Sequence, residues 1–137
     1  MGSQLNPYIA FRGNAREALE FYRSVFGGDL NINTYAEYGN DGPDGDKVMH
    51  GHLETPQGYH LMAADVSGEG APTSGGGNMS ITISGDDPRL RDFWAKLSEG
   101  GTVNMPFEKQ VWGDEYGDCT DRFGVRWAVD LGDPQTS

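Results

Sequence analysis

The stretch PYIAFRGNAREALEFYRSVFGG, residues 7–28, carries the signals of a strand, a turn and a helix in immediate succession. PYIAF is short, aromatic and β-branched, and it runs into a Gly-Asn turn, which is typical of a strand end. Asn14 with Glu17 three residues later predicts a helix N-cap, the apolar positions that follow have helical spacing, and a Gly-Gly pair predicts the stop. The stretch therefore predicts a strand followed by a helix.

Strand signals follow this helix. LNINTYAEY, residues 30–38, alternates apolar with polar side chains, and the loop after it is rich in turn-forming residues. KVMHGHLET, residues 47–55, and GYHLMAAD, residues 58–65, predict two strands joined by a tight turn. The first half of the chain thus reads as strand, helix and three strands.

The same order begins again after VSGEGAPTSGGG, residues 66–77, which we interpret as a linker, a mobile flap over a site, or both. NMSITIS predicts a strand, and residues 86–101 predict a helix with Asp87 as its cap and Pro88 at its first position. Further strand signals lie in TVNMPFEKQVW, EYGDCT and VRWAVD.

The two halves can be overlaid, because Phe21-Tyr22 corresponds to Phe93-Trp94 and Gly58-Tyr59 corresponds to Gly124-Val125. We therefore predict an α+β fold in a single domain, with two βαβββ modules at about residues 4–66 and 78–131 and a linker at about residues 67–77. One helix cannot cover both faces of a small sheet, so we expect a curved mixed sheet with a central groove and the helices outside.

Composition excludes several classes of function. The chain has 21 acidic and 10 basic residues and a net charge of −11, so its field repels nucleic acids and anionic membrane surfaces. No apolar run approaches the ~18 residues of a membrane span, and the first residues lack the layout of a secretory signal. A single cysteine, Cys119, fits a reducing compartment, so we expect a cytoplasmic protein.

The opening stretch resembles the glyoxalase, bleomycin-resistance and extradiol-dioxygenase (vicinal oxygen chelate) superfamily. VMHGHL at residues 48–53, GDDP at residues 85–88 and VWGDEYGDCTDRFGVRWAVD at residues 111–130 are similar, more narrowly, to its PhnB-like branch. The resemblance implies the paired βαβββ fold and a homodimer, because members commonly build their groove across two chains. It also brings a ubiquinone-methyltransferase label, which we set aside because no glycine-rich turn of a methyl-donor site is evident.

In the metal-dependent members of the superfamily, the ligands come from the first and last strands of each half. The resemblance places these positions at Asn6, Pro7 or Tyr8, at Asn78, Met79 or Ser80, at Met62 and at Ala128. None is a histidine or a carboxylate, and Asp130, two residues beyond Ala128, does not rebuild a site alone. We therefore expect no metal cofactor.

A rival metal site remains open in the first half. His50, His52 and Glu54 alternate on a predicted strand and point to one face, which can place two imidazoles and a carboxylate on one divalent ion. The alternative interpretation of His50 is a hydrogen-bonded histidine that lines the groove.

Candidate groove residues are those with polar or aromatic groups on the predicted strands and in the closing block. Trp127 alternates with two valines and is expected to pack beneath the second helix near Phe93 and Leu97. The candidates are Tyr8, His50, His60, Met62, Trp112 and Tyr116.

Three functions follow from these observations. The first is metal-independent binding of a small molecule, cationic or aromatic, between aromatic walls of an acidic groove. The second is a metal-dependent lyase or dioxygenase that uses the His50, His52 and Glu54 row. The third is a dimeric interaction module with no ligand, whose groove is filled by side chains. No residue is predicted to be catalytic under the first function.

Overall fold

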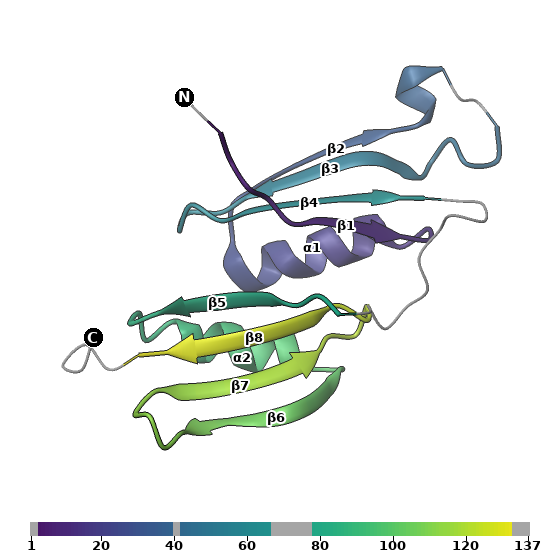
Figure 1. The fold of residues 1–137 in the computed structure, drawn as a ribbon. Helices are drawn as coiled ribbons and strands as arrows, with labels where there is room; N and C mark the ends of the chain where they lie inside the picture. The colour runs from purple at the N-terminus through teal and green to yellow at the C-terminus, as the bar shows by residue number, and fades with distance from the viewer. Residues whose placement is uncertain (1–2, 40–41, 67–77, 133–137) are drawn as a thin grey trace. The chain divides into compact units, whose positions relative to one another are not determined.

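A computed structural model describes residues 3–39, 42–66 and 78–132 (Figure 1). The chain divides into two compact units, Met1–Pro72 and Thr73–Ser137. The predicted linker at residues 67–77 lies outside the described residues. Among the residues described, no helix is long and apolar enough to cross a membrane.

The first unit is a four-stranded mixed sheet with one long helix. Its elements are β1 (Tyr8–Phe11), α1 (Ala15–Phe26), β2 (Asp29–Thr34), the short 3-10 helix η1 (Ala36–Tyr38), β3 (Val48–Glu54) and β4 (His60–Asp65). The strand order is β1-β4-β3-β2, with β1 parallel to β4 and the other pairs antiparallel.

The second unit repeats this plan. Its elements are β5 (Ile81–Gly85), α2 (Leu90–Ser98), β6 (Thr102–Lys109), β7 (Glu115–Thr120) and β8 (Arg126–Leu131). The strand order is β5-β8-β7-β6, again with one parallel pair, β5 and β8. The predicted α+β fold of two βαβββ modules is therefore confirmed.

In the first unit, α1 covers one face of the sheet. Leu19 and Tyr22 of the helix and Leu53 and Leu61 of the strands are buried together, and each such side chain contributes about 1.5–3 kcal/mol on burial. A Cβ on Gly51 would overlap the Leu19 side chain, so a glycine in β3 lets the helix approach closely. The sequence-predicted periodicity of the helix is thus the periodicity of its buried face.

In the second unit, α2 buries Phe93 and Leu97 on the side where Trp127 and Val129 of β8 are also buried. The Trp127 indole N–H donates to the Asp121 carboxylate at 2.9 Å. The prediction that Trp127 faces the second helix agrees with this arrangement.

Asn14 is the N-cap residue of α1, as the sequence predicts, whereas the N-cap residue of α2 is Arg89 and not Asp87. The Asn14 side chain makes no capping hydrogen bond; instead, the Asp65 carboxylate at the end of β4 accepts the N–H groups of Gly13 at 2.7 Å and Ala15 at 3.0 Å. The Asp65 carboxylate, distant in sequence, has thus replaced the Asn14 side chain as the acceptor, and the spacing of nearby residues cannot predict such a partner. The second helix begins at Leu90, after a turn that includes Pro88, and the predicted cap Asp87 lies before this turn, where its carboxylate accepts the N–H of Arg89 at 2.9 Å.

The two strand hairpins of the repeat are built in the same way. Thr55 and Asp121 are buried and occupy equivalent places, because the hydroxyl of Thr55 accepts the N–H of Tyr59 and the carboxylate of Asp121 accepts the N–H of Val125. The overlay made from the sequence places these residues at the same offset. The repeat therefore extends to individual hydrogen bonds.

Candidate functional site

In the first unit, α1 packs on one face of the sheet, and we call the opposite face, which points away from α1, the open face of the first sheet. Strand pairing fixes which side chains lie on it, because Tyr8 is opposite Met62, Met62 is opposite His52, and His52 is opposite Asn31. The members with polar or polarisable groups are Tyr8, Asn31, Asn33, His50, His52, Glu54, His60 and Met62.

Tyr8 and His50 form a hydrogen-bonded pair on this face. The Tyr8 hydroxyl lies 3.0 Å from His50 Nδ1, and the ring centroids are 5.6 Å apart. Burial and the neighbouring Tyr35 raise the pKa of the Tyr8 hydroxyl, and this hydroxyl can donate to or accept from His50 Nδ1 according to the tautomer of the imidazole. Tyr8 is nevertheless 55% exposed, so its ring is accessible to a ligand.

His52 and His60 form a second pair on the same face. His52 Nε2 lies 3.0 Å from His60 Nδ1, and the two rings are tilted by 38° with centroids 5.2 Å apart. Both side chains are partly exposed. All three histidines of the chain therefore lie on one sheet face, each with an aromatic or imidazole partner.

The histidines of the rival metal site belong to different pairs. His50 is hydrogen bonded to Tyr8, and His52 is hydrogen bonded to His60. Within residues 3–39, 42–66 and 78–132, no group of three or more His, Cys, Asp or Glu side chains is arranged to hold a metal ion.

The superfamily's ligand positions can be placed on the strands. Tyr8 and Met62 are direct neighbours on β1 and β4. In the second unit the residue opposite Ala128 is Thr82 on β5, two positions beyond Ser80, the last of the three positions that the resemblance had offered there. A phenol, a thioether, a methyl group and a hydroxyl are a poor set for a divalent ion. The side chains at these positions can instead contact an organic ligand by packing and by hydrogen bonds.

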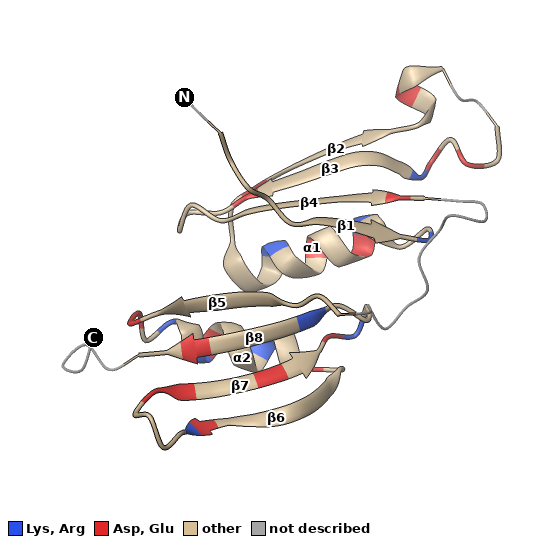
Figure 2. Ribbon diagram, in the orientation of Figure 1, with Lys and Arg blue, Asp and Glu red and all other residues tan. Residues whose placement is uncertain are grey.

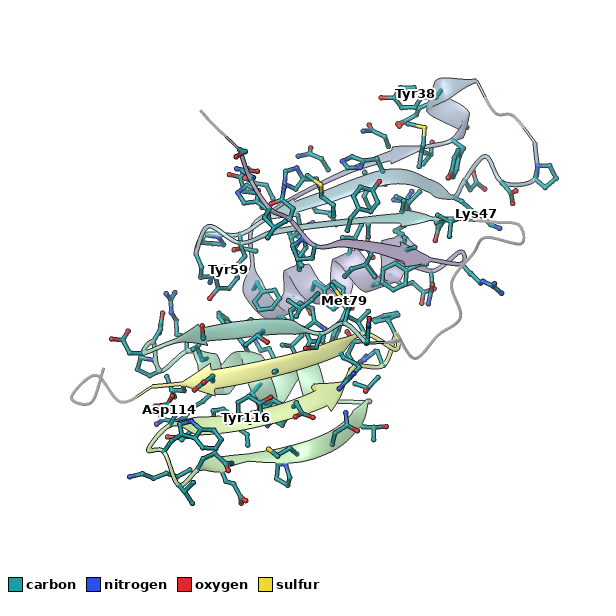
Figure 3. The ribbon with its side chains drawn as sticks, in the orientation of Figure 1. Tyr38, Lys47, Tyr59, Met79, Asp114 and Tyr116 are labelled. Carbon is teal, nitrogen blue, oxygen red and sulfur yellow. The ribbon has the colours of Figure 1, made fainter. Side chains whose placement is uncertain are left out.

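Trp112 and Tyr116 lie in the second unit. Tyr116 is in β7, within the predicted strand signal EYGDCT (Figure 3), and Trp112 lies in the turn between β6 and β7. Their ring centroids are 6.2 Å apart at an edge-to-face angle of 63°, and Trp112 is 57% exposed. The two rings form an exposed aromatic corner.

Acidic groups surround this corner. Tyr116 is opposite Asp130 on β8, and Asp118 is opposite Ala128, so these side chains share the face away from α2. Burial and the adjacent Asp114 carboxylate raise the pKa of Asp130, and burial together with Asp118 raises the pKa of Tyr116. Figure 2 shows the acidic segments of β7 and β8 that carry these groups.

The structure places four of the six predicted site residues, Tyr8, His50, His60 and Met62, on the open face of the first sheet, and the other two in the second unit. Sequence reasoning missed the pairing of His52 with His60. The tight turn at Thr55–Gly58 carries that signal, because it sets Glu54 opposite His60 and His52 opposite Met62.

Comparison with known proteins gives a consistent set of relatives. A family model described as 3-demethylubiquinone-9 3-methyltransferase matches residues 3–130. The structure of protein PA1353 from Pseudomonas aeruginosa is 33% identical, covers 96% of this chain and 98% of its own, and superposes with a TM-score of 0.83.

Two further structures share the fold. A PhnB protein from Bacillus cereus is 24% identical, with a TM-score of 0.75 over 95% of this chain and 100% of its own. A member of the glyoxalase, bleomycin-resistance and dioxygenase superfamily from Sphaerobacter thermophilus is 19% identical, with a TM-score of 0.62 over 96% of this chain and 98% of its own. The resemblance found in the sequence is confirmed.

Proposed function

The chain belongs to the PhnB-like family, and from this membership and the geometry of its first sheet we propose that it binds a small aromatic or cationic molecule through protein side chains alone. The ligand lies on the open face of the first sheet. No metal ion is needed to hold it there.

One observation carries this proposal: Tyr8, His50, His60 and Met62 come from three strands and share the face of the first sheet that points away from α1. An exposed phenol ring and a thioether offer an apolar contact surface, while the imidazoles and amides offer hydrogen bonds. In such a site the ring and the thioether would contact the ligand, and the polar groups would fix its orientation.

Charge supports a neutral or cationic ligand over an anionic one. The net charge of −11 lowers the local concentration of anions and raises that of cations. An aromatic ring face adds a cation–π contribution of about 0.5–1 kcal/mol at an exposed site. The acidic corner at Trp112 and Tyr116 has the same preference.

Methyl transfer, which the description of the family names, is not part of the proposal. A methyl donor would require polar groups for its carboxylate and ribose, and helix N-termini after parallel strands commonly supply them. At the start of α1 these backbone N–H groups are not free to bind a ligand, because the Asp65 carboxylate accepts the N–H groups of Gly13 and Ala15.

The homodimer and the cytoplasmic location implied by resemblance and composition stay predictions within this proposal. Sedimentation analysis at micromolar concentration tests the first. Binding to the open face of one chain does not depend on either.

The binding test uses three probes of similar size and different charge: benzyltrimethylammonium, benzyl alcohol and benzoate. Saturation-transfer NMR measures each affinity at low salt. We expect benzyltrimethylammonium to bind best and benzoate worst, and the difference to shrink as salt is added because the charges are exposed.

Variants locate the site. Tyr8→Ala and His50→Ala should each weaken binding of benzyltrimethylammonium about fivefold or more, equivalent to about 1 kcal/mol. Tyr38→Ala is the matched control, because Tyr38 is a 64% exposed tyrosine of the same unit in η1 (Figure 3). Equal affinities of wild type, Tyr8→Ala and His50→Ala would contradict the proposed site.

A further inference from the structure

His52 and His60 are held side by side by adjacent strands. β3 and β4 pair antiparallel, with His52 opposite Met62 and Glu54 opposite His60, so the two imidazoles are diagonal neighbours on one face. Such diagonal positions are within reach of aromatic side chains. The 3.0 Å separation of His52 Nε2 and His60 Nδ1 is that of a hydrogen bond.

A neutral imidazole has one N–H donor and one bare nitrogen acceptor. One proton therefore lies between the two facing nitrogens, on His52 or on His60. If His52 Nε2 carries it, His52 Nδ1 is bare and His60 Nε2 carries a proton. If His60 Nδ1 carries it, His52 Nδ1 carries a proton and His60 Nε2 is bare. In both states the outer nitrogens of the pair offer one donor and one acceptor.

We propose that His52 and His60 form a proton relay that exchanges the proton on a carbon next to a carbonyl group of a neutral or cationic ligand. The inference rests on the proposed ligand site, because it needs the carbonyl compound to reach the open face of the first sheet. It adds a reaction to what would otherwise be binding alone.

The step balances without any further reactant. The bare outer nitrogen takes the proton from the carbon, and the electron pair of the C–H bond becomes the enol double bond. The bridging proton moves across the His52–His60 hydrogen bond, and the other outer nitrogen gives its proton to the carbonyl oxygen or to water. The reverse step returns a proton to the carbon and restores the ketone.

The surroundings fit an uncharged carbonyl compound. Asn31 lies opposite His52 on the same face, and an amide N–H is the kind of neutral donor that stabilises a developing enolate oxygen. Met62, also opposite His52, offers an apolar contact for the rest of the ligand. Imidazole is the side chain most used for general acid–base catalysis, with typical gains of about 10²–10⁴.

Hydroxyacetone in deuterium oxide is the probe, because it is small, neutral and readily enolised. Proton NMR follows loss of its methylene signal in the presence of the whole chain and a chelator. We expect the wild-type protein to exceed the same concentration of 4-methylimidazole by about 100-fold or more. We expect His52→Gln and His60→Gln each to lose most of this gain, because either change breaks the relay.

Glu20→Gln is the control, since Glu20 is an exposed carboxylate of α1, on the other side of the first sheet. It should leave the exchange rate within about twofold of wild type. The relay is excluded if His52→Gln or His60→Gln reacts like wild type, or if the chelator abolishes exchange. It is also excluded if Glu54→Gln abolishes exchange while His52→Gln and His60→Gln do not, because Glu54 would then be the base. A wild-type rate equal to that of free 4-methylimidazole excludes it as well.

The imidazole ¹⁵N signals of the wild-type protein test the bridge without any variant. One of His52 Nε2 and His60 Nδ1 should carry the proton, or the two should share it in exchange; two bare or two protonated facing nitrogens would overturn the relay. Binding of benzyltrimethylammonium without exchange of hydroxyacetone would remove the relay and leave the binding proposal standing. Exchange is measured directly in solution, so it can succeed even if that probe fails to bind.

Discussion

Two buried aspartates, Asp65 in the first unit and Asp121 in the second, each accept three N–H groups within their own unit. Asp65 accepts three backbone N–H groups, from Gly13, Ala15 and Val48, and so joins β1, α1 and β3 at the end of β4. Asp121 accepts the N–H groups of Phe123 and Val125 and the indole N–H of Trp127. Hydrogen bonds to charged groups contribute about 1.5–3 kcal/mol, more than neutral ones.

The variant Asp65→Asn should lower the free energy of unfolding by about 2–4 kcal/mol, because an amide cannot accept all three N–H groups and leaves at least one buried donor unpaired. Asp44→Asn is the control; its exposed ion pair with Lys47 is worth less than about 1 kcal/mol. Urea unfolding measures both. Similar stabilities for the two variants would contradict the role given to Asp65.

Cys119 is fully buried in β7, and burial together with Asp121 and Asp118 raises the pKa of its thiol to about 11. The reactive thiolate is therefore depleted at neutral pH. We expect a thiol reagent at pH 8 to react about 100-fold or more slowly with the native chain than with the chain unfolded in denaturant, since each pKa unit is a factor of ten. Comparable rates in the two states would show that the thiol is not buried.

Asp130 has its pKa raised by burial and by Asp114. The folded state therefore binds more protons than the unfolded state between the two pKa values, and stability falls as pH rises through that interval. The variant Asp130→Asn cannot ionise at this position, so it does not lose stability as the pH rises. We expect its melting temperature to exceed that of wild type at pH 7 and the gain to vanish near pH 3; a lower melting temperature at pH 7 would contradict this.

At the scale of elements, the connection after each helix depends on a glycine. A Cβ on Gly28 would overlap the backbone at Glu54 and Thr55, and a Cβ on Gly101 would overlap the backbone at Thr120 and Asp121. In each unit the chain leaving the helix thus passes directly against the corner where a strand ends. The pair Gly27-Gly28, which the sequence marked as the stop of the first helix, therefore has this second role.

Gly101→Ala should lower the free energy of unfolding by about 2 kcal/mol or more, because the neighbouring atoms are backbone and cannot turn aside. Gly39→Ala is the comparison, because Gly39 has φ of +97° but open space around it, and should cost only about 1–2 kcal/mol of backbone strain. Thermal unfolding ranks the two. A smaller effect at Gly101 than at Gly39 would contradict the close approach.

The sequence predicted the elements well where local periodicity decides them. The repeated order of strand and helix, the buried face of α1 and the β4 hairpin follow from spacing and turn residues alone. The hydrogen bonds at the start of α1 differ from the predicted ones because their acceptor is Asp65, about fifty positions away in the sequence. The His52–His60 pair likewise depends on strand register, which a pattern of alternation does not give.

At the scale of the whole molecule, the net charge of −11 and the open sheet face jointly predict the kind of ligand. Acidic residues occur in both units (Figure 2). The first sheet contributes tyrosine and histidine rings that can form hydrogen bonds, and the electrostatic field of the negatively charged chain favours cations over anions. The central claim is that a ligand lies on the face away from α1.

The most direct test is a titration of the ¹⁵N-labelled chain with benzyltrimethylammonium, followed by backbone amide shifts. We predict saturable shifts that are largest at Tyr8, His50 and Met62, with much smaller shifts along α1 and in η1. Shifts confined to α1 would contradict the account. So would the absence of saturable shifts at up to about 10 mM benzyltrimethylammonium, because the binding free energy would then be weaker than about 3 kcal/mol.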